Sequence, residues 1–195
     1  MKLIIRFVLF SFLIFFSCQD ENEARRIQQQ KEIAKKEDVA KRIHSAWNFR
    51  TVSLSPLATN FTNDWAEWRL FQTELYQKPT NSLTAFQKKS KMLTKKADEV
   101  LQTIPGILFR PEFKTRFTVL LNKFRSIEMY LNLTEIPEKK VIGLISEINL
   151  ELLSIESQMN ELARKNQIPM EQGEADMIRM LDTSRAVKEI PKNLD

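Results

Sequence analysis

Glycine, cysteine and histidine are scarce in this chain of 195 residues, which has three glycines, one cysteine and one histidine. So few glycines nearly exclude a Gly-rich phosphate loop and disfavour tight β-hairpins, because both use residues with positive φ. A single cysteine excludes internal disulfides and a structural zinc site built on cysteines. A single histidine excludes the paired Glu-x-x-His motifs of a di-iron bundle. The chemistry open to an enzyme or a metal site is therefore narrow, and no cofactor or metal is expected.

The sequence also lacks an apolar run of the ~20 residues that a bilayer-spanning helix needs. Its apolar run at Phe7–Phe16 is shorter, follows the basic residues Lys2 and Arg6, and ends just before Cys18. A basic start, a short apolar core and a small residue before the break are typical of a secretory signal peptide. We therefore expect residues 1–17 to be a cleaved signal.

The residues around the cysteine resemble the lipobox of bacterial lipoproteins, in which Leu, a small residue and Gly, Ala or Ser precede the cysteine. Ser17 and Cys18 match this pattern, while Phe15–Phe16 stand at the Leu and small-residue positions. The acidic stretch that begins at Asp20 is similar to the signal that sends lipoproteins of the Bacteroidota to the cell surface. The resemblance covers residues 1–23 and implies nothing about the rest of the chain.

The resemblance implies that Cys18 is acylated and becomes the first residue of the mature protein. Two or more acyl chains hold a protein durably on a membrane. The expected location is the cell envelope, as an outer-membrane lipid anchor on the periplasmic side or the cell surface. The alternatives are plain secretion and a retained anchor. An unpaired cysteine is unusual in an oxidising compartment, and lipidation of Cys18 would explain why it is there.

Apolar residues recur at alternating spacings of three and four after residue 61, which predicts amphipathic helices packed in coiled-coil fashion. Prolines and capping residues divide the pattern into helices near 62–77, 81–104, 111–131 and 134–168, with a shorter one near 174–189. The expected inward residues of the last two long helices are Phe113, Phe117, Leu120, Phe124, Ile127 and Leu131, and then Val141, Leu144, Ile148, Leu152, Ile155, Met159 and Leu162. Short connections favour an all-α, up-and-down antiparallel bundle, and no segment has the pattern of a strand.

Four further segments complete the expected domain organisation. Residues 18–44 are rich in charge with few apolar residues, which favours a lipidated cysteine and a helical or partly disordered stalk, with a partner-binding helix as the alternative. Residues 45–61 lose the helical period and are expected to cross the bundle in extended form. The bundle then covers 62–190 and a tail covers 191–195.

Candidate catalytic groups are few. His44, the one histidine, has Lys41 and not Glu three positions before it, so we interpret it as a stalk-end residue or a cap. Glu147 and Glu151 lie one turn apart, and such a pair could perform acid–base work or hold a cation, although a solvated flank is the simpler interpretation. We therefore predict a protein that is not an enzyme, with an envelope hydrolase as the weakest alternative.

The best candidate for a binding surface is a group of lysines between residues 88 and 96, of which Lys88, Lys91 and Lys95 share one helix face. On an anchored domain this face could contact an anionic envelope component or an acidic partner, while the alternative is a solvated face. The lysine run lacks interleaved aromatic residues of the kind that stack on bases, so nucleic acid is not an expected partner. After loss of residues 1–17 the net charge falls from +5 to +3, which is too small to indicate nucleic-acid binding by itself. Trp65 with Trp68 fits core packing better than binding.

Met170, Met177 and Met180 could form an adaptable docking surface or fill gaps under the last helix.

Taken together, these features predict a lipid-anchored envelope protein that acts as a non-catalytic binding or scaffold module, through a protein partner or an anionic envelope component. An inhibitory or immunity lipoprotein, which neutralises a toxin or an enzyme, fits the same features and differs only in its partner.

Overall fold

The computed structural model describes residues 2–167 and Met180, with side chains from Glu23 onward. All of its regular elements are helices, and no strand occurs among these residues, which confirms the predicted all-α class. The elements are α1 (Lys2–Ala46), α2 (Pro56–Thr62), α3 (Ala66–Tyr76), α4 (Leu83–Gln102), α5 (Pro111–Leu131) and α6 (Glu138–Lys165).

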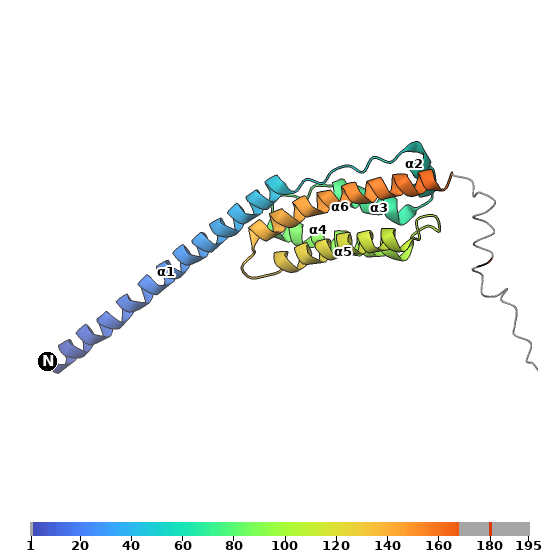
Figure 1. Ribbon diagram of the computed structural model, residues 1–195. Coiled ribbons are helices and arrows are strands. Elements are labelled where there is room, and N and C mark those ends of the chain that lie inside the picture. The colour runs from blue at the N-terminus through green and yellow to red at the C-terminus, as the bar shows by residue number, and fades with distance from the viewer. Residues whose placement is uncertain (1, 168–179, 181–195) are drawn as a thin grey trace, which may run out of the picture.

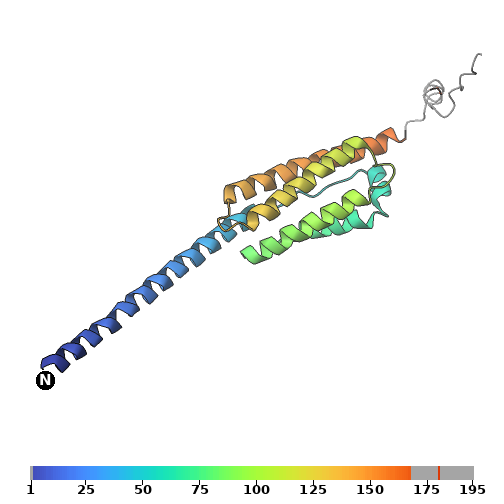
Figure 2. The ribbon, with the colours of Figure 1, turned by 90° about the horizontal axis from the view of Figure 1, so that it is seen from below.

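Helices α3, α4, α5 and α6 pack in sequence order as antiparallel neighbours, and α1 leaves this bundle as a long rod (Figures 1 and 2). The rod joins the bundle where α4 and α6 begin and α5 ends. We call this the junction end, and we call the opposite end, where α5 begins and α6 ends, the far end. The up-and-down topology expected from the short connections is therefore present.

The helix starts follow the signals in the sequence. Ser82 has extended backbone angles before α4, and its Oγ accepts a hydrogen bond from the Ala85 amide at 3.2 Å. Pro111 occupies the first position of α5, where its missing N–H leaves no intrahelical bond unmade. Pro137 precedes the first residue of α6. These boundaries lie within a few residues of the predicted ones.

The buried face of each long helix makes up the core. All six expected inward residues of α5 are at most 1% exposed: Phe113, Phe117, Leu120, Phe124, Ile127 and Leu131. In α6, Ile145 and Ala163 are buried where the expected seam placed Leu144 and Leu162, which are only partly buried. The buried row of α6 is thus shifted by one residue at these two places, while Leu152 is fully buried as predicted.

The expected crossing segment is extended only in part. Residues 47–55 run along α6, and three α6 side chains accept hydrogen bonds from its amides, at 2.8 to 3.0 Å: Asn149 from Arg50, Glu156 from Ser53 and Asn160 from Ser55. The second half of the predicted segment is instead helix α2, because Ser55 caps the Ala58 amide and a proline follows at the first helical position. The expectation of an extended chain to residue 61 is therefore wrong for residues 56–61.

The stalk is helical to Ala46, and its last turns belong to the bundle. Ala40 and Ile43 are at most 3% exposed and Trp47 is 2% exposed, so the predicted boundary at residue 44 lies inside the core. Two ion pairs join the stalk to the junction end: Arg42 Nε lies 2.6 Å from Glu138, and Lys35 Nζ lies 2.8 Å from Glu135.

Three expectations fall outside the described residues: the helix near 174–189, the tail at 191–195 and the bundle boundary at 190. Met180, the one described residue in that part, is 87% exposed. Across the described residues, no helix has both the length and the apolar character that crossing a bilayer requires.

Candidate functional site

The predicted lysine face lies on the solvent side of α4. Lys88, Lys91 and Lys95 are all exposed. Within the described part of the chain Lys88 and Lys91 have no ion pair, while Lys95 lies 3.9 Å from Glu99. Two positive charges of this face are thus uncompensated by a close carboxylate.

The neighbouring lysines of the same run do not belong to that face. Lys89 is only 7% exposed, and its Nζ donates to Glu74 of α3 at 2.7 Å. Lys96 donates to Glu99 at 2.7 Å. Lys89 thus joins α4 to α3 and Lys96 pairs within α4, so the basic surface is narrower than the sequence run suggests.

The candidate catalytic residues are held in structural contacts. His44 is partly buried, and its ring meets Phe86 edge-on at 6.2 Å between centroids. Lys123 of α5 lies between the two α6 carboxylates, 2.6 Å from Glu147 and 3.6 Å from Glu151. In the described part of the chain no group of three or more His, Cys, Asp or Glu residues is placed to hold a metal ion.

Trp65 and Trp68 are buried and stacked, with ring centroids 5.8 Å apart. The Trp65 Nε1 donates to the Thr103 hydroxyl at 3.0 Å, so the polar atom of this ring has a partner. Core packing is therefore the role of this pair.

Cys18 lies within α1, before the first described side chain, and its acylation stays a prediction.

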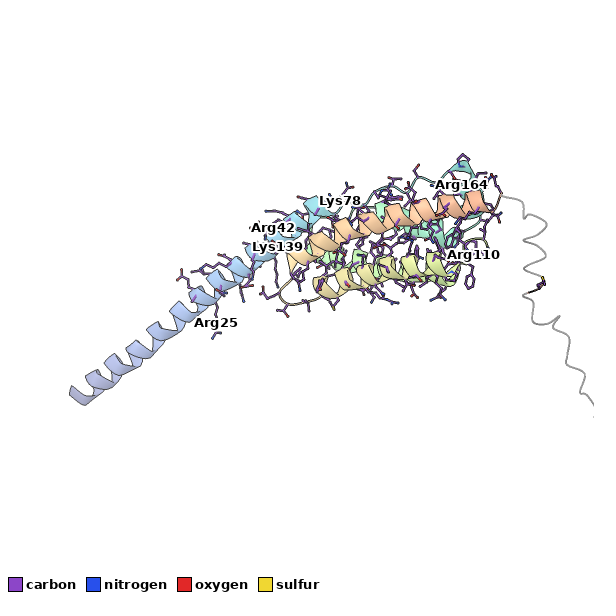
Figure 3. All side chains as sticks on the ribbon, viewed as in Figure 1. Arg25, Arg42, Lys78, Arg110, Lys139 and Arg164 are labelled. Carbon is purple, nitrogen blue, oxygen red and sulfur yellow. The ribbon has the colours of Figure 1, made fainter. Side chains whose placement is uncertain are left out.

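A cleft at the far end was not expected from the sequence. It has a volume of about 830 Å³ and lies between the start of α5 and the last turns of α6. Arg110 and Arg164 lie at this end of the molecule, opposite the stalk (Figure 3). The lining residues are Ile107, Arg110, Glu112, Arg116, Ser154, Ser157, Gln158, Glu161, Leu162, Lys165 and Asn166.

Among the basic side chains that line this cleft, one has a carboxylate partner within the part of the chain that the structure describes and two do not. Lys165 lies 2.7 Å from Glu161. The hydrogen bond from Lys165 is the largest cause of the lowered pKa of Glu161, and the charges of Arg164 and Arg116 lower that pKa further. Arg116 donates to the Ser154 hydroxyl, and Arg110 has no carboxylate partner among the described residues. The cleft therefore contains two guanidinium groups that no close carboxylate neutralises.

The sequence contains a signal that could have located this cleft. Arg110 and Arg116 flank the start of a proline-initiated helix, and Lys165 lies in the last turn of the next helix. Because the two helices were expected to be antiparallel, their opposite termini had to meet. A second, smaller cleft of about 460 Å³ lies at the junction end between the stalk, α4 and the α5–α6 loop.

No protein-family model, curated protein or solved structure matches this chain.

Proposed function

We propose that the protein is a lipid-anchored cell-envelope protein that presents a non-catalytic helical binding module on a rigid stalk. The observation that carries the proposal is α1, one uninterrupted helix that contains Cys18 and ends inside the core of the bundle. A helix rises ~1.5 Å per residue, so about 25 Å separates Cys18 from Lys35, where the stalk first pairs with the bundle.

The position of the far end supports a binding role. The stalk enters at the junction end, so a chain anchored at Cys18 would turn the far-end cleft away from the membrane (Figure 1). The buried last turn of α1, assisted by the two ion pairs at the junction, would limit how far the bundle leans toward the bilayer. Anchor, spacer and outward cleft are what a tethered binding module requires.

Membrane fractionation of cells that make the full chain tests this proposal. The wild-type protein is expected in the membrane fraction and in the detergent phase of a detergent–water partition. Cys18→Ser should move it to the soluble or uncleaved pool, and Ser17→Ala, which keeps a small residue before the cysteine, should behave like wild type. Equal partitioning of wild type and Cys18→Ser would refute lipid anchoring.

A crosslinking pull-down from intact cells with a tagged chain addresses the binding role. Recovery of one envelope component supports a binding or scaffold module. Recovery of a toxin or an enzyme whose activity the protein blocks would instead identify the inhibitory alternative. A chain that crosslinks to nothing above the level of an unrelated lipoprotein would contradict both.

A further inference from the structure

The far-end cleft combines features that together specify the charge of a ligand. Arg110 and Arg116 line it without a close carboxylate from the described part of the chain. Lys165 pairs with Glu161, whose carboxylate also interacts with the charge of Arg116, and Glu112 is the other acid of the lining, so three basic residues face two acids. Guanidinium groups bind carboxylate and phosphate oxygens in a two-bond, planar geometry, so an anion is the natural occupant.

The start of α5 adds to this preference. No side chain caps this helix, and Pro111 at its first position has no N–H. The amides that follow in the first turn therefore lack a side-chain acceptor, and the positive end of the helix dipole points toward the side on which Arg110 lies. The N-terminus of a helix attracts anions, and the N-terminus of α5 lies at the far end together with Arg110, Arg116 and the cleft.

Gln158 indicates a second property of the ligand. Its Oε1 atom is buried, accepts no hydrogen bond within the described structure, and belongs to a residue that lines the cleft. A buried acceptor without a donor costs about 1–3 kcal/mol. In its present rotamer the atom has almost no accessible surface, so the Gln158 amide would turn toward the cleft to accept a hydrogen bond from a ligand hydroxyl or amine.

The size and polarity of the cleft agree with a small polar ligand. Its volume of about 830 Å³ lies in the ~300–1,000 Å³ range of small-molecule sites. Most of its lining residues are charged or polar, with Ile107 and Leu162 as the apolar ones. A hydrophobic ligand would leave these polar groups without partners.

We propose that the far-end cleft binds a small anion that carries a phosphate or carboxylate group together with a hydroxyl or amine. Arg110 and Arg116 bind the anionic group, and Gln158 accepts a hydrogen bond from the neutral donor. This inference rests on the proposed function, since it names the class of ligand that the binding module takes.

Isothermal titration calorimetry on the mature full chain in detergent micelles tests the inference, with glycerol 3-phosphate, inorganic phosphate and glycerol as probes. Glycerol 3-phosphate should bind more tightly than inorganic phosphate, and glycerol should not bind. Arg110→Gln and Arg116→Gln should each weaken both phosphates about tenfold, the effect of losing one charge-assisted hydrogen bond. Arg110→Gln is the safer variant for folding because that side chain has no bonded partner among the described residues.

Gln158→Leu should remove the preference for glycerol 3-phosphate over inorganic phosphate while leaving phosphate affinity unchanged. Lys139→Gln is the matched control, because it deletes one exposed positive charge at the start of α6, outside the cleft. Absence of glycerol 3-phosphate binding at millimolar concentration, or equal affinity in Lys139→Gln and both arginine variants, would overturn the inference.

A water-soluble, short-chain phosphatidylglycerol distinguishes the sources of this chemistry. Tighter binding than glycerol 3-phosphate assigns the site to a lipid headgroup, and weaker binding assigns it to a free ligand. The cleft variants leave Cys18 intact, so failure of anion binding and failure of membrane anchoring are separate results.

Discussion

At the residue scale, the core depends on side chains whose burial followed from helical spacing. Leu120 of α5 and Leu152 of α6 are both fully buried, on neighbouring helices. Their positions were predictable because the period of an amphipathic helix points every third or fourth residue to the same side. Leu150 has the same chemistry two positions away but is 66% exposed, because it lies on the opposite face.

Truncation of either buried leucine should destabilise the bundle. Leu120→Ala or Leu152→Ala should lower the free energy of unfolding by about 2–5 kcal/mol, through lost burial and the cavity left behind. Aspartate at either position should cost more, because it buries a charge without a partner. Leu150→Ala is the control, with an expected change within about 0.5 kcal/mol. Chemical denaturation that gives all three alanine variants equal stability would show that the register is wrong.

At the scale of elements, the long helices were predictable, whereas helix α2 and the packing of residues 47–55 were not. Three of the bonds that hold this segment come from α6 side chains about 100 residues further along the chain, and the Val52 amide donates to the Tyr76 hydroxyl of α3. Asn149 both accepts from the Arg50 amide and donates to the Asn48 carbonyl, at 2.8 and 3.0 Å. Local spacing contains no information on such long-range pairs, whereas the cleft could have been located from the basic residues at the facing termini of α5 and α6.

Removal of that asparagine should release the segment. Asn149→Ala leaves two backbone groups without partners, which should cost about 1–3 kcal/mol and raise the hydrogen-exchange rate of the Arg50 amide. Ser146→Ala, which removes only a bond within the same helix, is the control. Unchanged exchange at Arg50 in Asn149→Ala would mean that other contacts hold the segment.

The solvent side of α4 presents a separate prediction. If Lys88, Lys91 and Lys95 contact an anionic surface, their reversal to Glu should abolish flotation with anionic vesicles of the lipid-free chain that begins at residue 19. Added salt should weaken the wild-type interaction, because exposed charges are screened within about 8–10 Å. The melting temperature should barely change, since these residues are exposed. Equal flotation of both proteins, or none, would identify a solvated face.

At the scale of the whole molecule, we expect the exposed ion pair between Lys35 and Glu135, at the junction between stalk and bundle, to respond to pH. The hydrogen bond from Lys35, with its charge, lowers the pKa of Glu135 below its usual 4.5, and the same contact raises the pKa of Lys35 above its usual 10.5. Because the carboxyl pKa of Glu135 is lowered on folding, the contact is present above the pKa of the unfolded chain and is lost as pH falls through the pKa of the folded protein. Because the pKa of Lys35 is raised on folding, the contact is also lost as pH rises through the folded-state pKa of that lysine.

The junction pair should therefore be intact at neutral pH and weaken at both extremes. Hydrogen exchange in the α5–α6 loop should quicken, relative to its intrinsic rate, as the pH falls below 4.5. Glu135→Gln should show the faster relative exchange already at neutral pH and lose the acid transition. An acid transition that persists in Glu135→Gln would assign it to another group, such as Glu138, which pairs with Arg42.

The proposed tether is an acylated Cys18 that holds the bundle on a membrane. Intact-mass spectrometry of the protein purified from its own cells measures this modification most directly. The expected chain lacks residues 1–17, starts at Cys18 and carries the added mass of two or more acyl chains on that residue. A chain of unmodified mass, or one cleaved at another position with a free Cys18 thiol, would show that the protein is not lipid-anchored.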